Sequence, residues 1–293
     1  MTYLMTNNPD SALHREELLS VTEERFQKIT ARLKAVVETF QEEDIHDFRI
    51  EIKKLKALLR LFREKAKHPS DLKFPKFLDK IYTLLGSMRE MQLQQNKLGK
   101  AVNNQNSLLS STFSVLDEEI NAVKEKIIQL LKNEKSLEKA KDKFLQFIPE
   151  KLTRKTVDRY FVNNMKKLKR ILSMKRLSIE PLHRMRKILK DLQYNRFYRQ
   201  ENETRESETV TLPLDEIHYT TTIIGDLHDA YAATALMEKE LHTNSIQKDE
   251  KTLLLQVRLL WKKERSDLRK PVDEELNKLR TYPYFGGNMS SDN

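Results

Sequence analysis

The stretch EDIHDFRIEIKKLKALLRLF, residues 43–62, carries two patterns at once. Apolar residues recur at every third or fourth position, which is typical of a helix that buries one face. Between the apolar residues stand one histidine and five cations: His46, Arg49, Lys53, Lys54, Lys56 and Arg60. At 100° per residue, all of these except Lys54 fall within about 80° of arc. The segment therefore predicts a helix whose core face lies beside a basic face.

This basic face contains no acidic residue. Helices that face water usually mix charges of both signs, since like charges three or four residues apart cost a few tenths of a kcal/mol per pair. The face is either an ordinary solvated surface or a surface that holds an anion. Arginine offers a planar fork to phosphate oxygens and lysine offers a point charge, so a chain of phosphates would suit the spacing.

The same arrangement recurs 137 residues further along the chain. IHDFRIEIKKLKALLRLF (45–62) aligns with LHRMRKILKDLQYNRFY (182–198), so that His46, Arg49 and Lys53 fall on His183, Arg186 and Lys190. Each of these segments is followed by one member of a second matching pair, YTLLGSMREM (82–91) and TTIIGDLHDA (221–230), in which Gly86 falls on Gly225. Two homologous halves that meet near residues 149–152 are the simplest explanation.

The composition favours helices throughout. Five glycines and eight prolines among 293 residues, with 33% charged residues, disfavour a β-rich fold. The best strand candidate is short, TVTLP (209–213), and loops are expected at 97–111 and 199–213, with a frayed end from 281. The predicted helices are 11–40, 43–67, 73–99, 108–133, 134–148, 152–176, 180–201, 212–243 and 248–281. We therefore expect an all-α fold with an N-terminal half at 1–150, a C-terminal half at 151–281 and a tail at 282–293.

The charge and the cysteine count narrow the kinds of partner and site that the protein can have. The formal net charge is +10, and residues 151–200 alone hold sixteen Lys and Arg against three acidic residues. Such local basicity points to an anionic partner: nucleic acid, acidic lipid or a phosphate polymer. The absence of cysteine excludes disulfides and thiolate metal sites. No apolar run approaches the roughly 20 residues of a membrane span, and no secretory signal opens the chain, so we expect a cytoplasmic location without membrane contact.

The pattern His–x–x–Arg, followed by basic residues seven, eight and ten positions after the histidine and by an aliphatic run, resembles the CHAD domain (conserved histidine α-helical domain). The sister motif ending in Tyr194, and the elements LLGSMRE (84–90) and IIGDLHD (223–229), are similar to further motifs of that family. The resemblance covers roughly residues 10–270. It implies two antiparallel four-helix bundles related by a pseudo-two-fold, with basic residues of both halves in a central groove. It also implies binding of inorganic polyphosphate without cleavage, with no cofactor or metal, and polyphosphate granules as one location.

Carried over residue by residue, the resemblance implies a polyphosphate site of residues on both halves. They are His46, Arg49, Lys53, Lys54, Lys56, Arg60, Arg89, His183, Arg186, Lys187 and Lys190. Asp191 and Gln193 stand where the family often has basic residues, so we expect the second half to bind more weakly. Lys187 and the cluster 166–170 could compensate for this.

Other interpretations stay open at this point. His46-Asp47 and His228-Asp229 are HD pairs of the kind that bind metal in phosphohydrolases, although the sequence shows no set of residues that completes such a site. A nucleic-acid binder could use the same basic faces, but the aromatic residues do not interleave with them as stacking requires. The segment LLLQVRLLWKKERSDLRK (253–270) is either a solvated face or an outer wall of the groove, with Trp261 in the core or at an interface.

Overall fold

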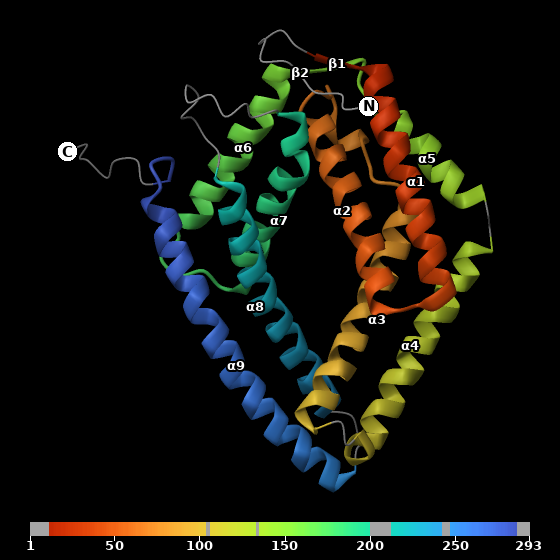
Figure 1. Ribbon diagram of the computed structural model, residues 1–293, viewed down its shortest axis with the longest axis vertical. Coiled ribbons are helices and arrows are strands. Elements are labelled where there is room, and N and C mark those ends of the chain that lie inside the picture. The colour runs from red at the N-terminus through yellow and green to blue at the C-terminus, as the bar shows by residue number, and fades with distance from the viewer. Residues whose placement is uncertain (1–11, 104–105, 133–134, 200–211, 242–246, 286–293) are drawn as a thin grey trace. The chain divides into compact units, whose positions relative to one another are not determined.

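The computed structural model describes residues 12–103, 106–132, 135–199, 212–241 and 247–285. Within these ranges the chain forms long α-helices and one two-stranded sheet (Figure 1). The helices are α1 (Arg15–Thr39), α2 (Glu42–Arg63), α3 (Lys76–Ala101), α4 (Ser110–Leu131), α5 (Lys135–Leu145), α6 (Arg154–Leu172), α7 (Ile179–Asn195), α8 (Leu214–Leu241) and α9 (Lys248–Thr281). The strands are β1 (Ala12–His14) and β2 (Lys151–Thr153), and short 3-10 turns cover Pro69–Asp71, Asn106–Leu109 and Arg196–Tyr198.

The all-α prediction is confirmed, and the differences concern element ends. The loop expected at 97–111 is shorter, because α3 continues to Ala101 and α4 begins at Ser110. The helix expected at 180–201 ends at Asn195 and passes into a 3-10 turn. Two three-residue strands pair where none was expected. Most of the strand candidate 209–213, of the connection 199–213 and of the frayed end lies outside the described residues.

Contacts divide the chain into two compact units. The N-terminal unit comprises His14–Glu150 and Ala232–Lys262, and the C-terminal unit comprises Met1–Leu13, Lys151–Tyr231 and Lys263–Asn293. The chain thus passes between the units at residues 13–14 and 150–151, and again within α8 and within α9. A division into 1–150 and 151–281 does not include the return of 232–262 to the first unit. That the two units are homologous halves stays a prediction.

Two apolar clusters hold the N-terminal unit together. Phe144 is fully buried, and its ring centroid lies 5.7–6.5 Å from those of Phe26, Phe62, Phe74 and Phe147. Aromatic pairs at such distances add to the stabilisation from burial alone. The second cluster joins α3 and α4 to the neighbouring ends of α8 and α9 through Met91, Leu98, Leu116, Met237, Leu254, Val257 and Trp261. Trp261 is 4% exposed, as predicted for a core residue.

Polar contacts between helices accompany the apolar core of the C-terminal unit. Arg280 on α9 donates to the backbone oxygens of Leu172 and Met174 at the end of α6. Thr220 on α8 donates to the buried carboxylate of Glu275 on α9, over 2.7 Å. These bonds fix the α6–α7 connection and the start of α8 against α9. No helix in the part of the chain that the structure describes is long and apolar enough to span a membrane.

Candidate functional site

The first basic stripe consists of His46, Arg49, Lys53, Lys56 and Arg60 on α2. All five side chains are partly exposed, while the adjoining face of α2 buries Ile45, Phe48, Ile52, Leu55 and Leu59 at 2% exposure or less. Because one side of the helix is committed to the core, the stripe lies along the margin between core and solvent. The arc predicted from the helical period is therefore present as one continuous surface row.

Two members of the first stripe are tied to α3. Arg49 donates from Nη1 to the backbone oxygen of Tyr82 over 2.5 Å, and its guanidinium lies 4.2 Å from the centre of the Tyr82 ring. The Lys56 Nζ atom lies 2.7 Å from Asp79 and 4.0 Å from the same ring centre. Burial lowers the pKa of both cations. Tyr82 thus holds two cations in fixed positions.

His46 lies among cations. Burial lowers its pKa below the usual value, and the positive charges of Arg89 and Lys53 lower it further. The structure thus brings Arg89 of α3 close to the stripe, and Nη2 of Arg89 lies 3.6 Å from a carboxylate oxygen of Glu42. His46 is therefore neutral at pH 7 and can donate one hydrogen bond to an anion.

Lys54 belongs to another face of α2. Its Nζ atom lies 2.6 Å from a carboxylate oxygen of Glu51. Glu51 is 8% exposed and forms a second ion pair, over 2.8 Å, with Arg25 of α1. The structure therefore separates Lys54 from the other predicted ligands. The residue of the second half that aligns with Lys54 is Asp191, and it is 8% exposed. Asp191 is therefore buried and lies off the exposed row, and the weaker binding expected of the second half stays a prediction.

The second basic stripe consists of His183, Arg186, Lys187 and Lys190 on α7. Arg186 donates from Nε to the backbone oxygen of Thr221 on α8 over 2.9 Å. Lys190 donates to Gln193 over 3.1 Å, and burial followed by the charge of Arg186 lowers its pKa. Lys187 is exposed. As on α2, an arginine is anchored on the next helix of its unit.

A glycine makes each anchor possible. Tyr82 and Thr221, whose oxygens accept the bonds, each stand four residues before a buried glycine, Gly86 or Gly225. A Cβ atom at Gly86 would collide with Nη1 of Arg49. At Gly225 it would lie 3.0 Å from Nε of the corresponding arginine. The two elements aligned in the sequence thus form the same local contact in both units.

His228 is a neighbour of the second stripe that the site prediction omitted. Its ring stacks on His183, with ring centroids 4.7 Å apart and an interplanar angle of 29°. Burial lowers the pKa of His183, and His228 and Lys187 lower it further. His228 stands three residues after Gly225, as Arg89 stands three after Gly86, so the aligned repeat already contained the signal. The imidazole of His228 thus stands at the position that the guanidinium of Arg89 has in the first unit.

Substituting Gly86 tests the anchor. Gly86→Ala is expected to destabilise the protein by about 1 kcal/mol or more, because the added methyl group displaces Arg49 from the Tyr82 oxygen. In an Arg49→Ala background, the same substitution is expected to stabilise by up to about 1 kcal/mol through helix propensity alone. Urea unfolding of the four proteins measures this reversal of sign. An effect of the same sign in both backgrounds would contradict the role of the glycine.

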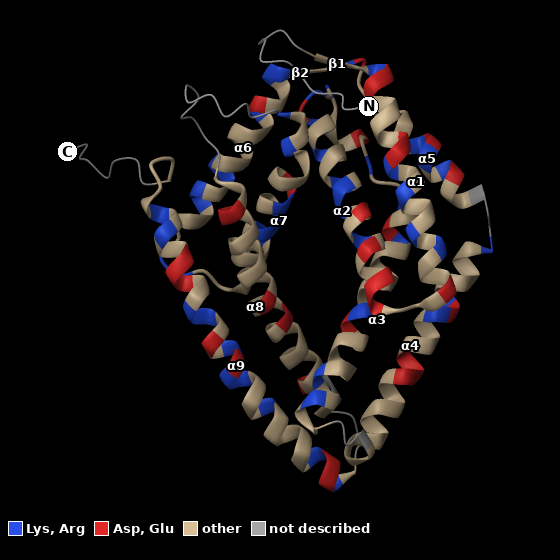
Figure 2. Ribbon diagram, in the orientation of Figure 1, with Lys and Arg blue, Asp and Glu red and all other residues tan. Residues whose placement is uncertain are grey.

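The other cationic segments behave differently. Lys166, Lys169 and Arg170 are exposed on α6. Along α9 positive and negative residues alternate (Figure 2), and Arg258 and Lys262 lie 4.0 and 3.5 Å from Glu238 of α8. Arg265 covers the ring of Tyr231 at 4.5 Å. Arg258, Lys262 and Arg265 thus have local partners, which agrees with a solvated face.

An all-α chain with matching basic rows on two helices, each backed by an arginine over a glycine, has the features expected of a CHAD domain. The model of the CHAD domain family matches residues 20–238, three quarters of the sequence, and the chain belongs to that family. Membership is consistent with a polyphosphate-related function. No curated protein sequence matches the chain.

Solved structures share the fold. The crystal structure of the CHAD domain from the plant Ricinus communis is 16% identical, with a TM-score of 0.70 over 94% of this chain and 95% of that one. PptA from Streptomyces chartreusis is 12% identical, with a TM-score of 0.65 over 90% of this chain and 99% of that one. At these identities the likeness concerns the fold alone.

Proposed function

We propose that the protein binds inorganic polyphosphate through the two basic stripes and does not cleave it. The supporting observation is the repeated anchor, because both units hold an arginine on a backbone oxygen beside a glycine and display lysine next to it. Anchored cations bind with little loss of side-chain freedom. The outward lysines add charge along the helix at intervals of about one turn, or 5.4 Å.

The histidines fit this proposal as neutral donors. Burial and neighbouring cations lower the pKa of His46 and of His183, so neither adds charge at pH 7. The Nδ1 atom of His183 is buried and makes no hydrogen bond to a described residue. A phosphate oxygen accepts hydrogen bonds and carries negative charge, so it would stabilise either ring whether neutral or protonated.

Nucleic acid is the main competing ligand, since it also carries one charge per phosphate. Single strands gain much of their affinity from bases stacked on aromatic rings. The aromatic ring that accompanies the first stripe, Tyr82, is covered by Arg49 and Lys56 and is not free for a base. The first stripe therefore offers charge without a free Tyr82 ring for stacking, which favours the polymer that lacks bases.

A competition experiment tests the proposal. Unlabelled polyphosphate is expected to displace labelled polyphosphate at a concentration at least about tenfold lower than single-stranded DNA of equal charge. The measurement is fluorescence anisotropy at fixed ionic strength. DNA that competes equally well or better would replace the proposal with nucleic-acid binding.

The phosphohydrolase hypothesis needs a set of metal ligands. Among the residues that the structure describes, no group of three or more His, Cys, Asp or Glu could hold a metal ion. The HD pair of α8 is engaged otherwise, since His228 stacks on His183. Release of phosphate from polyphosphate in the presence of Mg²⁺ or Mn²⁺, and its loss in His46→Ala, would support hydrolysis instead.

A further inference from the structure

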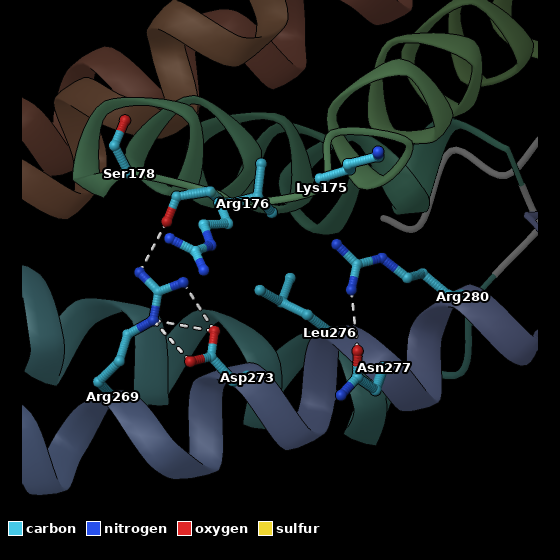
Figure 3. A pocket seen from close by; sticks show the side chains of 9 residues that line it. Lys175, Arg176, Ser178, Arg269, Asp273, Leu276, Asn277 and Arg280 are labelled. Atoms are coloured by element: carbon cyan, nitrogen blue, oxygen red, sulfur yellow. Dashed lines mark hydrogen bonds and ion pairs between the residues drawn. The ribbon is translucent and has the colours of Figure 1, made fainter.

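A second group of cations lies in the C-terminal unit, and it includes no residue of the stripes. A pocket of about 560 Å³ opens between the α6–α7 connection and α9 (Figure 3). Its charged lining residues are Lys175, Arg176, Arg269, Arg280 and Asp273, so four positive charges face one negative charge. The remaining lining residues are Leu177, Ser178, Leu276 and Asn277.

Two arginines of the pocket are held in place by the protein. Arg269 donates from Nη1 to the backbone oxygen of Leu177 over 2.7 Å and pairs with Asp273 through Nε and Nη2. Arg280 donates to the oxygens of Leu172 and Met174 over 2.9 and 3.0 Å. A guanidinium has five N–H donors, so each arginine retains donors beyond these bonds. Both cations are therefore oriented before any ligand arrives.

The other two cations lack such partners. Lys175 and Arg176 are exposed, and among the described residues neither takes part in a hydrogen bond or an ion pair. Figure 3 shows both on the connection that faces α9, with Arg176 near Arg269 and Lys175 near Arg280. Like charges gathered in this way repel each other, and a bound anion would remove the repulsion.

We propose that this pocket binds a small inorganic oligophosphate such as pyrophosphate. Two phosphate groups carry enough negative charge to balance a formal excess of three positive charges on the lining residues. Arg269 and Arg280 each donate three of their five N–H groups to the protein, counting the bond from Arg280 to Asn277, and the remaining two can donate to phosphate oxygens. The lining includes no aromatic ring, so the pocket offers no platform for the base of a nucleotide. This inference does not depend on polyphosphate binding by the stripes.

Calorimetry of the full chain with pyrophosphate tests the pocket. Lys175→Glu with Arg176→Glu is expected to weaken binding at least about 30-fold, because two charge-assisted contacts become repulsive. Lys166→Glu with Lys169→Glu is the matched control, since it makes the same change of net charge at exposed positions of α6 outside the pocket. The control is expected to bind pyrophosphate within about threefold of wild type.

Three results would overturn the proposal. They are absence of pyrophosphate binding to the wild type, unchanged binding by the pocket variant, and an equal loss in the matched control. ATP that binds more tightly than inorganic triphosphate would contradict the choice of a ligand without a base. Because Lys175 and Arg176 are exposed, the pocket variant should fold, and an unchanged circular dichroism spectrum verifies this.

Discussion

Lys53→Glu combined with Lys187→Glu is expected to weaken the binding of long-chain polyphosphate by about 100-fold or more. Each substitution removes one charge-assisted contact and adds repulsion against the nearest phosphate. One lysine belongs to each stripe, and both side chains reach solvent at least in part. Neither forms the arginine anchors, so the helices should keep their packing. Anisotropy titration with a labelled polyphosphate of fixed length measures the change.

The choice of these lysines depends on the structure. Arg49→Glu would place a carboxylate against the backbone oxygen of Tyr82, where the wild type has a donor. The oxygen would keep its intrahelical bond, but a carboxylate would be desolvated and repelled beside it, so lost binding in that variant could reflect altered packing. The same reasoning applies to Arg186 and the oxygen of Thr221. Lys53 and Lys187 take no part in these arginine anchors, so substituting them separates the effect on the ligand from the loss of an anchor.

The matched control is Lys34→Glu with Lys155→Glu. These lysines are exposed on α1 and α6, one in each unit, and the change of net charge is identical. We expect the control to lose less than about fivefold in affinity, through the general field of the protein alone. Equal losses in both variants would mean that polyphosphate responds to net charge and not to the stripes.

The helices and the stripes could be predicted because both depend on period. Apolar residues at helical spacing determine which face of α2 is buried, and the arc left over contains His46, Arg49, Lys53, Lys56 and Arg60. The helical period of 100° per residue also places Lys54 outside that arc, and in the structure Lys54 pairs with Glu51 on another face of α2. His228 could have been found as well, through the position that aligns with Arg89.

Tertiary neighbours could not be predicted in this way. That Lys56 meets Asp79 and Tyr82, or that Arg49 lies beside Gly86, depends on how α2 packs against α3. The pocket is a stronger case, because about 90–110 residues separate the connection that supplies Lys175 from the part of α9 that supplies Arg269 and Arg280. A helical period describes one element, and these sites arise where two elements meet.

Salt should weaken polyphosphate binding steeply. Each cation that contacts a single-stranded polyanion releases counterions and contributes about 0.7 to the slope of log K against log salt. If about six side chains of the stripes contact phosphate, the slope is about −4, and raising salt from roughly 50 to 200 mM lowers affinity about 300-fold. Anisotropy titrations across that range, with the length of polyphosphate held constant, measure the slope.

The salt dependence of the variant Lys53→Glu with Lys187→Glu tests direct phosphate contact more strictly than its loss of affinity does. Loss of the contacts of Lys53 and Lys187 should bring the slope to about −3, so the same change of salt lowers affinity only about 50-fold. The control with Lys34 and Lys155 substituted should retain the wild-type slope, since these residues make no phosphate contact in the proposal. A variant that binds more weakly with an unchanged slope would show that both lysines act at a distance. The contacts would then have to be sought among the anchored cations, Arg49, Lys56 and Arg186, whose fixed positions suit a chain of phosphates equally well.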